Sequence, residues 1–366
     1  MTRRDVALPA YRVTVEAGAL DRIGEIVRET AHAHRYAVIT DSNVGPRYAS
    51  RVTARLGATE SRVFTVDAGE SQKTRQTWGR LTDELLAAGF GRDSTVIALG
   101  GGVVGDLAGF VAATFMRGVP YVQVPTTLLA MVDASVGGKT GVDTDAGKNL
   151  VGAFHQPAAV IADTSLLSTL PLDHLRAGMA EAIKHGVIAD AAYFESASAA
   201  AAGVQSLDVA SESTLDLVAR SVEIKADLVR RDEREGGVRK TLNFGHTLGH
   251  AVELCSRYEL LHGYSVAIGM VCEAEIAERM GIAEAGTASR IRDTMRAAGL
   301  PHSLPRGIDA ENVITATRGD KKARAGRVEY ALPQRIGEMA SGDGSWAVPV
   351  GDDTVREVLA AHALLG

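Results

Sequence analysis

Short apolar runs alternate with amphipathic segments over the first half of the chain. Residues 36–40 (YAVIT) have the length and composition of a buried strand, whereas residues 75–89 (RQTWGRLTDELLAAG) place apolar side chains at helical spacing. By the same criteria, strands are predicted at residues 11–18, 36–40, 61–69, 94–102 and 121–127, and helices at 19–30, 47–56, 75–89 and 105–115. Alternation of this kind predicts a parallel sheet flanked by helices.

From about residue 172 onward the pattern is almost wholly helical. Helices are predicted at residues 173–188, 190–202, 212–230, 243–257, 264–280 and 284–298, with one short strand at 328–337. The predicted fold class is therefore an α/β domain, residues 1–172, followed by an all-α domain, residues 173–366. Ligands often bind where two such domains meet, so we expect the site in a cleft there.

Composition and charge argue against several kinds of protein. The chain has 366 residues and a net charge of -6, which disfavours a nucleic-acid binder that relies on bulk positive charge. The first residues, MTRRDVALPAYRV, contain no apolar run long enough for a signal peptide. The most apolar region, residues 95–115, is interrupted by Asp106 and by glycines, so no membrane span is predicted. Cys255 and Cys272 lie in an apolar helical stretch and are predicted to be buried thiols, which suits a reducing cytoplasm.

The stretch GGGVVGD (100–106) contains a G-x-G-x-x-G pattern between a predicted strand and a predicted helix. Glycines in this position let the backbone approach a pyrophosphate at the helix N-terminus, which favours a dinucleotide site; a tight turn without a ligand is the alternative. The motif follows a late strand, not the first, and no acidic residue lies about 20 positions on. Asp41, or Glu70 with Lys73, is available for a ribose instead, which indicates an atypical Rossmann-like strand order.

Lysines are concentrated in a glycine-rich segment, residues 131–154. Lys139 and Lys148 in this segment suggest anion binding, with a solvent-facing loop as the alternative. The apolar residues 125–138 that lead into it argue against a mobile loop. Other cations are individually typical of a surface and gain meaning only as a set: Lys184, Lys225, Arg239, Lys321 and Lys322.

The stretch LNFGHTLGH (242–250) presents two histidines one helical turn apart. His246 and His250 would share a helix face, and His262 precedes the next predicted helix. An earlier helix, RAGMAEAIKHGVI, places Glu181 and Lys184 on one face. A carboxylate and two imidazoles are a common ligand set for catalytic zinc. The residues alone leave open both a metal site and a group of structural histidines. Glycines inside this helix cost about 1 kcal/mol each, which indicates close backbone packing or the approach of a ligand.

Taken together, the chemistry-bearing segments resemble those of the 3-dehydroquinate synthases, which belong to the sugar-phosphate cyclases. The resemblance extends over nearly the whole chain in the family order and spacing. It rests on GGGVVGDLAGFVAATFMRG, VPTTLLAMVDASVGGKTGVDTDAGKNLVGAFHQP, GMAEAIKHGVI, RRDEREGGVRKTLNFGHTLGHAVE, LHGYSVAIGM and GDKKARAG.

The resemblance implies an N-terminal NAD-binding domain and a helical metal- and substrate-binding domain. It implies a carbon–oxygen lyase that closes 3-deoxy-D-arabino-heptulosonate 7-phosphate into 3-dehydroquinate with loss of phosphate, in the shikimate pathway. NAD is used and regenerated within each turnover, and a divalent metal, zinc or cobalt, is required. A homodimer in the cytoplasm is expected, with no nucleic-acid or membrane partner.

The resemblance also implies roles for individual residues. Glu181, His246 and His262 match the metal ligands, whereas His250 matches a position near the phosphate that transfers a proton. The catalytic set further includes Glu235 as a proton acceptor, Asp133 and Lys184 near the reacting hydroxyls, and Lys225. Lys225 and Arg239 match the pair that holds the substrate carboxylate, and Arg117 matches an arginine that reaches in from the partner subunit. The phosphate contacts are Lys139, Asn149, Asn243, His250 and a lysine of the pair Lys321 and Lys322. The NAD site comprises Asp41, Asn43, Glu70, Lys73, Gly101, Gly102, Val103, Asp106, Thr126, Thr127, Lys139, Lys148 and Thr169.

Three other functions compete with this interpretation. A sister cyclase acting on a sugar phosphate without an acid group would leave Lys225 and Arg239 without a partner, although an amino analogue of the keto acid would retain it. A metal-dependent polyol dehydrogenase would release NADH and would have little use for the cation set. A binding protein without activity is disfavoured by the intact metal and cation sets.

Overall fold

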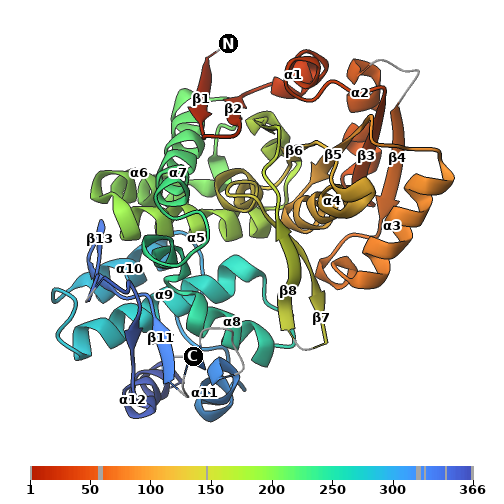
Figure 1. Ribbon diagram of the computed structural model, residues 1–366. Coiled ribbons are helices and arrows are strands. Elements are labelled where there is room, and N and C mark those ends of the chain that lie inside the picture. The colour runs from red at the N-terminus through yellow and green to blue at the C-terminus, as the bar shows by residue number, and fades with distance from the viewer. Residues whose placement is uncertain are drawn as a thin grey trace. The chain divides into compact units, whose positions relative to one another are not determined.

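The computed structural model describes residues 2–56, 61–145, 147–318, 323–324, 327–342 and 344–363, which form two units (Figure 1). The first unit comprises Met1–Leu170 and Asp208–Ala226, and the second comprises Pro171–Leu207 and Asp227–Gly366. Helix α7 (Glu212–Arg231) starts in the first unit and ends in the second. Each unit is therefore assembled from two separate stretches of sequence.

A seven-stranded sheet forms the centre of the first unit. Its order is β1 (Arg3–Ala7), β2 (Arg12–Glu16), β9 (Ala159–Ala162), β6 (Tyr121–Pro125), β5 (Ser94–Gly100), β3 (Arg35–Asp41) and β4 (Ser61–Val66). Neighbouring strands are parallel except for β1 and β2. Every residue of β5 is buried, as expected for a parallel strand covered on both faces. The predicted parallel sheet flanked by helices is confirmed.

The direction of strand order reverses at β3. The chain proceeds from β3 outward to β4 and then returns to place β5 on the other side of β3. In open α/β sheets, ligands bind beyond the carboxyl ends of the strands at such a reversal. Asp41 ends β3 and Gly100 ends β5, so the acidic residue and the glycine-rich turn flank this point.

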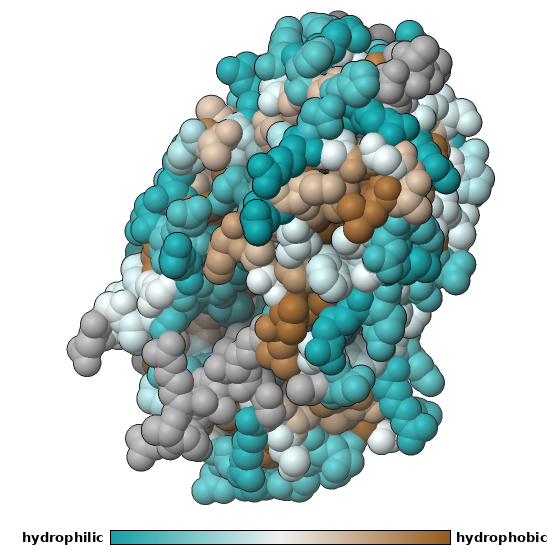
Figure 2. All heavy atoms as spheres, turned by 45° about the vertical axis from the view of Figure 1, so that its right-hand side comes forward, coloured by the Kyte–Doolittle hydropathy of each residue, from teal (hydrophilic) through white to brown (hydrophobic). Residues whose placement is uncertain are grey.

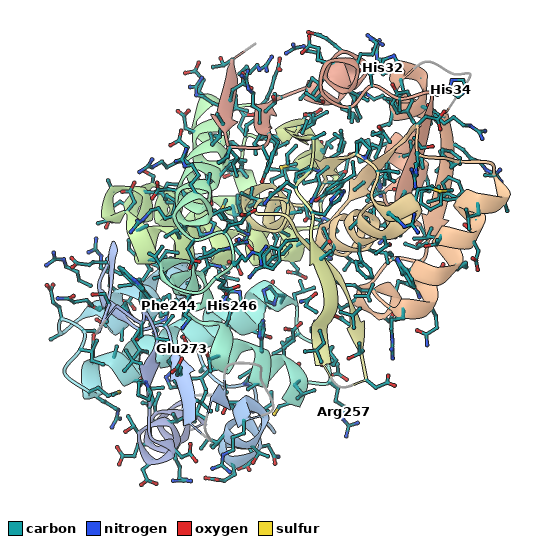
Figure 3. The ribbon with its side chains drawn as sticks, in the orientation of Figure 1. His32, His34, Phe244, His246, Arg257 and Glu273 are labelled. Atoms are coloured by element: carbon teal, nitrogen blue, oxygen red, sulfur yellow. The ribbon has the colours of Figure 1, made fainter. Side chains whose placement is uncertain are left out.

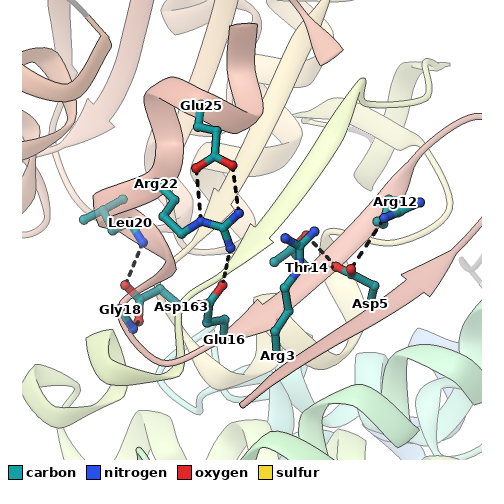
Figure 4. Close-up of polar contacts among 10 residues, drawn as sticks. All are labelled: Arg3, Asp5, Arg12, Thr14, Glu16, Gly18, Leu20, Arg22, Glu25 and Asp163. Atoms are coloured by element: carbon teal, nitrogen blue, oxygen red, sulfur yellow. Dashed lines mark hydrogen bonds and ion pairs between the residues drawn. The ribbon is translucent and has the colours of Figure 1, made fainter. Parts of the chain in front are cut away.

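Helices cover the first-unit sheet. They are α1 (Ile23–Thr30), α2 (Gly45–Leu56), α3 (Arg75–Ala87) and α4 (Gly102–Thr114), with short 3-10 turns at Ala19–Arg22, Glu70–Gln72, Phe115–Arg117 and Thr164–Thr169. On one face, Leu81 of α3 and Leu107 of α4 pack with Ile39 and Phe64 of the strands. Directly after β9, the fully buried carboxylate of Asp163 accepts hydrogen bonds from the backbone of Gly18 and Leu20 (Figure 4).

The lysine-rich segment forms a hairpin apart from the main sheet. A π-helical turn (Ala130–Ala134) leads into β7 (Lys139–Thr144), which pairs antiparallel with β8 (Gly147–Phe154). This hairpin agrees with the expectation that residues 131–154 are not a mobile loop. The two strands lie so close together that a Cβ added to Gly152 would be only 2.1 Å from the carbonyl oxygen of Thr140.

The second unit is mainly helical. Its helices are α5 (Leu172–Ala189), α6 (Ala191–Ala202), α8 (His246–Cys255), α9 (His262–Arg279), α10 (Thr287–Ala297), α11 (Ala310–Arg318) and α12 (Asp352–Ala363), with 3-10 turns at Val204–Ser206 and Val238–Asn243. Short strands accompany them at Ala323–Arg324, Arg327–Tyr330, Pro333–Arg335, Glu338–Met339 and Val348–Pro349. Of these, Pro333–Arg335 lies within the predicted strand region 328–337 and Arg327–Tyr330 overlaps it. Of the two cysteines, Cys272 is buried as predicted but Cys255 is only partly buried. Among the helices described, none has the length and apolar character to cross a membrane.

Glycines bring three helices of the second unit into backbone contact. A Cβ on Gly269 of α9 would lie 2.0 Å from the carbonyl oxygen of Gly245, which precedes α8. A Cβ on Gly249 of α8 would lie 3.0 Å from the carbonyl oxygen of Ser265, and one on Gly263 of α9 would lie 2.1 Å from that of Ala177 in α5. Of the two explanations for the helical glycines, close backbone packing is therefore the one that the structure shows.

Candidate functional site

The glycine-rich turn joins β5 to α4 in the first unit. Gly101 is the N-cap of α4, and among the described residues no side chain caps this helix. A Cβ on Gly105 would lie 2.7 Å from Oε1 of Gln123, and one on Gly109 would lie 2.5 Å from Cγ2 of Thr140. The glycines thus hold α4 against β6 and β7, and the backbone N–H groups of its first turn suit an anion.

Lys73 links the turn to the hairpin. Its side chain is 5% exposed, and Nζ lies 2.6 Å from Oδ2 of Asp106 and 2.5 Å from Oδ1 of Asn149. Burial works against the charge on Lys73, but the carboxylates of Asp106 and Glu70 raise its pKa. Asn149 has a left-handed backbone, φ 54°, and its N–H donates to Oδ1 of Asp143 at 2.8 Å. Residues predicted for NAD and for phosphate therefore share one network.

Other predicted NAD residues lie in the same unit. Nζ of Lys148 lies 3.2 Å from Oε1 of Glu70. Oδ1 of Asp41 accepts from the N–H of Asn43 at 2.8 Å, and Thr169 Oγ1 lies 2.7 Å from the hydroxyl of Tyr48. The remaining members occupy the first turn of α4 and the segment after β6: Gly101, Gly102, Val103, Thr126 and Thr127.

A second cation in the first unit is paired with the predicted catalytic carboxylate. Lys225 of α7 is 7% exposed, and its Nζ lies 2.8 Å from Oδ1 and 2.6 Å from the carbonyl oxygen of Asp133. Lys139 begins β7 and is exposed. Arg117 is also exposed, in a turn where Met116, Arg117 and Gly118 all have positive φ values, of 51°, 69° and 114°.

The second unit brings the metal candidates together. Oε1 of Glu181, which is fully buried, lies 3.6 Å from Nε2 of His246 and 3.6 Å from Nε2 of His262. Glu181 also forms an ion pair with Lys184 one turn along α5. The histidine ligand atoms of His246, His250 and His262 all lie within 4.8 Å of one another, close enough to hold one metal ion. The geometry therefore fits a metal with Glu181 and two histidines, and it also admits His250.

The imidazole nitrogens are arranged by their hydrogen bonds. Nδ1 of His246 lies 3.1 Å from the carbonyl oxygen of Phe244, and Nδ1 of His262 lies 3.3 Å from Oε2 of Glu253. Both Nε2 atoms are thereby turned to Glu181. Burial, followed by the charge of Lys184, holds the pKa of His246 well below its usual value. Burial acts the same way on His262, but Glu181 and Glu253 outweigh it and raise its pKa to about 9. The neutral imidazole of His246 is the form that binds a metal.

The segment before α8 positions three further candidates. Nδ2 of Asn243 donates to Oε1 of Glu235 at 2.6 Å, and Glu235 has a left-handed backbone, φ 60°. Arg239 is 1% exposed. The Asp232 carboxylate accepts from the backbone N–H groups of Gly236, Gly237 and Arg239 at 2.9, 2.7 and 3.1 Å. Lys321 and Lys322 lie outside the described residues.

Two carboxylates near the histidines are absent from the sequence-based set. Glu253 contacts His262, and Glu273 of α9 contacts the backbone at the start of α8 (Figure 3). Both are acidic residues inside apolar helical patterns, where a single charged side chain usually faces solvent. Their burial could only be found from the packing of α8 on α9.

Comparisons with known proteins match both halves of the chain. The family model described as 3-dehydroquinate synthase N-terminal matches residues 63–177, and that described as 3-dehydroquinate synthase C-terminal matches residues 178–323. A curated 3-dehydroquinate synthase from Symbiobacterium thermophilum is 46% identical over 334 residues, which cover 90% of this chain and 92% of the relative. One from Nostoc punctiforme is 41% identical, covering 97% of this chain and 98% of the relative.

Solved structures share the fold over the whole length. A 2-epi-5-epi-valiolone synthase from Streptomyces hygroscopicus subsp. jinggangensis, with NAD+ and Zn2+ bound, has a TM-score of 0.88 at 29% identity and covers 100% of this chain and 99% of its own. A 2-deoxy-scyllo-inosose synthase complexed with carbaglucose-6-phosphate, NAD+ and Co2+ has a TM-score of 0.86 at 24% identity, covering 99% of this chain and 100% of its own. At 24% identity, the second likeness concerns the fold alone.

Proposed function

Because the chain belongs to the 3-dehydroquinate synthase family, we propose that it converts 3-deoxy-D-arabino-heptulosonate 7-phosphate into 3-dehydroquinate and phosphate, as a carbon–oxygen lyase. The observation that carries the proposal is the match of both family models to a chain whose Glu181, His246 and His262 converge. Two free cysteines fit the reducing cytoplasm in which this enzyme would act.

The cofactors follow from the same reasoning. Glu181, His246 and His262 would hold a divalent zinc or cobalt ion, and NAD would lie at the strand-order reversal with its pyrophosphate at the start of α4. When bound, NAD supplies a hydride acceptor that is regenerated, and the metal supplies a Lewis acid for a substrate oxygen. NAD+ with Zn2+ in the valiolone synthase supports this assignment.

The chain's own residues would bind and orient the substrate. Lys139 and Asn149, at the hairpin, would hold the phosphate together with Asn243 and His250, and Lys225 and Arg239 would hold the carboxylate. Lys225 and Arg239 are 7% and 1% exposed, so the fold holds both cations in place, and a charge-assisted hydrogen bond from either one to a carboxylate would be strong. Lys184 and Asp133 would lie at the reacting hydroxyls. His250 and Glu235 would move protons, and the 2.6 Å contact of Glu235 with Asn243 would orient its carboxylate.

We also propose that the enzyme is a homodimer in which Arg117 serves the site of the partner subunit. Arg117 is exposed, in a turn with three consecutive positive φ values, so its guanidinium is accessible to a second subunit. Apolar side chains of β8 are exposed as well, namely Leu150, Val151 and Phe154. The face drawn in Figure 2 likewise has apolar patches within a mainly hydrophilic surface. Exposed apolar groups of this kind favour a protein interface.

The activity is tested by phosphate release. Purified protein is incubated with the heptulosonate phosphate, zinc or cobalt, and NAD in a small fraction of the substrate concentration. We expect phosphate release over many turnovers of NAD without accumulation of NADH. Phosphate release only from a sugar phosphate that lacks the carboxylate would contradict the proposal in favour of a sister cyclase, and net NADH would favour a dehydrogenase. A parallel reaction with the amino analogue of the keto acid separates the two carboxylate substrates.

A further inference from the structure

Helix α8 begins without a side-chain cap of its own. Its N-cap is Gly245, which has a left-handed backbone with φ 77°, and His246 is the first helical residue. Helix N-termini leave N–H groups that need acceptors. Here the acceptor comes from α9: Oε2 of Glu273 lies 2.6 Å from the N–H of Gly245, and Oε1 lies 3.0 Å from that of Leu248. The carboxylate therefore holds the backbone on both sides of His246.

The contact in the other direction is made by Glu253 of α8. Its Oε2 lies 3.3 Å from Nδ1 of His262, the first residue of α9. Because Nδ1 faces this carboxylate, Nε2 is the ring nitrogen that faces Glu181, 3.6 Å away. A carboxylate on the second nitrogen of a metal-binding histidine fixes the ring orientation and makes it a better ligand.

Both carboxylates are buried where burial is unfavourable. Glu273 is fully buried and Glu253 is 4% exposed. Helices α8 and α9 pack backbone to backbone around them, through Gly249 and Gly269. Buried charges are costly unless they are satisfied by hydrogen bonds, and one use for which they are retained is to specify a single arrangement. The arrangement specified here is that of two histidines.

We propose that Glu253 and Glu273 are reciprocal positioning residues, each extending from one helix to fix the metal-binding histidine that begins the other. The proposal rests on the proposed metal site and adds the reason why two histidines on separate helices keep one geometry. In this proposal neither glutamate is a ligand of the metal. Glu253 acts on the imidazole of His262 directly, and Glu273 acts on His246 through the backbone of the first turn of α8.

The test measures binding of Co2+ to the metal-depleted protein, by competition with a chromophoric chelator and by the visible absorption of the bound ion. We expect Glu253→Ala to weaken Co2+ binding about 10–100-fold and to change the spectrum, because the orientation of His262 is lost. Glu253→Gln keeps an acceptor oxygen and should restore most of the affinity. Glu273→Gln replaces one acceptor by a donor facing an N–H group, and it should weaken binding as well.

Glu275→Gln is the matched control. Glu275 is also a carboxylate on α9, partly buried, but it pairs with Arg292 and lies 3.0 Å from Nε2 of His362, neither of which is a metal candidate. Thermal stability is measured for every variant, and we expect Glu275→Gln to lower it without changing the Co2+ spectrum.

The outcomes separate the two proposals. If the wild-type protein binds Co2+ and Glu253→Ala and Glu273→Gln bind it with the same affinity and spectrum, the positioning role is overturned. The proposed function is then unaffected. The positioning role is also overturned if Glu275→Gln loses as much Co2+ affinity as these variants at the same loss of thermal stability. The weaker binding would then reflect a general loss of stability. Absence of Co2+ binding in the wild-type protein would overturn the metal site and the positioning role together.

Discussion

Oε1 of Glu181 lies 3.6 Å from Nε2 of His246, although the two residues belong to different helices, α5 and α8. His250, one turn further along α8, has its ring centroid 5.3 Å from that of His246. Helical spacing alone would treat these two histidines as equivalent ligands. The proposed ligand set distinguishes them, because it contains His246 with Glu181 and His262 but not His250.

We therefore expect different effects from removing each histidine. His246→Ala should abolish tight binding of zinc or cobalt, because two of three ligands rarely hold a catalytic metal. His250→Ala should retain the metal and lower kcat by about 100-fold or more, as for loss of a general acid or base. Metal content by mass spectrometry and turnover of the same samples provide the measurement. Equal loss of metal from both variants would show that His250 is a ligand, consistent with the three-histidine group.

Lys73 should be important for the stability of the first unit. In Lys73→Met, the carboxylate of Asp106 loses its buried cation, and the free energy of unfolding should fall by about 3 kcal/mol. Lys148→Gln is the control, because its ion pair with Glu70 is partly exposed and should contribute less than about 1 kcal/mol. Urea denaturation of both variants tests the difference. Similar small losses would indicate that water satisfies Asp106 when Lys73 is removed.

Replacement by alanine should have opposite effects on stability at two helical glycines, one at the close approach of α8 and α9 and one in α3. Gly269→Ala would place a Cβ 2.0 Å from the carbonyl oxygen of Gly245, so it should destabilise the protein by about 3 kcal/mol. Gly79 lies within α3, and a Cβ there meets no atom within 4 Å, so Gly79→Ala should stabilise by about 0.5–1 kcal/mol. Thermal unfolding measures both. A Gly269→Ala protein as stable as the wild type would mean that the helices can separate freely.

The carboxylate of Asp232 should give the protein an acid-dependent contribution to stability. Burial works against its charge, but the N–H groups of Gly237, Gly236 and Arg239 hold its pKa below the usual value. A lowered pKa stabilises the folded state above about pH 4 and ceases to do so as pH falls through the folded-state pKa. Asp232→Asn should be less stable than the wild type at pH 7, and this difference should shrink as the pH falls below about 4.

The melting temperature as a function of pH tests this expectation. Asp227→Asn is the control, since Asp227 is an exposed residue of α7 that contacts Arg230 and Arg231. A stability difference for Asp232→Asn that stays constant down to pH 2 would contradict the role of the ionised carboxylate.

The role proposed for Arg117 predicts complementation between two inactive variants. Arg117→Ala and His246→Ala should each be inactive as homodimers. In a mixed dimer, one site combines an intact His246 with an intact arginine from the other subunit, so co-expression should restore part of the activity. No recovery in purified mixed dimers would show that Arg117 acts within its own subunit.

Much of the architecture was predictable because its signals are local. The buried run of β5 and the amphipathic pattern of α3 follow from periodicity, and both are present in the structure. The hairpin of β7 and β8 was harder, because Gly141 and Gly152 interrupt any alternating pattern. The two strands are stabilised by pairing with each other, and neither strand's sequence shows this pairing by itself.

The site shows the same division. His246 and His262 stand out in the sequence, but Glu253 and Glu273 do not, because a glutamate in an amphipathic helix normally faces water. What makes these two buried is the absence of a side chain at Gly249 and Gly269 on the facing surfaces. The burial of these two glutamates therefore depends on the sequences of both helices and cannot be predicted from either helix alone.

The path of the chain between the units limits how the protein can be taken apart. The two family models meet between residues 177 and 178, inside α5, so a fragment cut there would divide a helix. A fragment ending at Leu170 would lack Val218 and Val222 of α7, which are fully buried, and Lys225 with them. A chimaera that takes the first unit from a related enzyme must therefore take residues 208–226 from it together with the N-terminal segment.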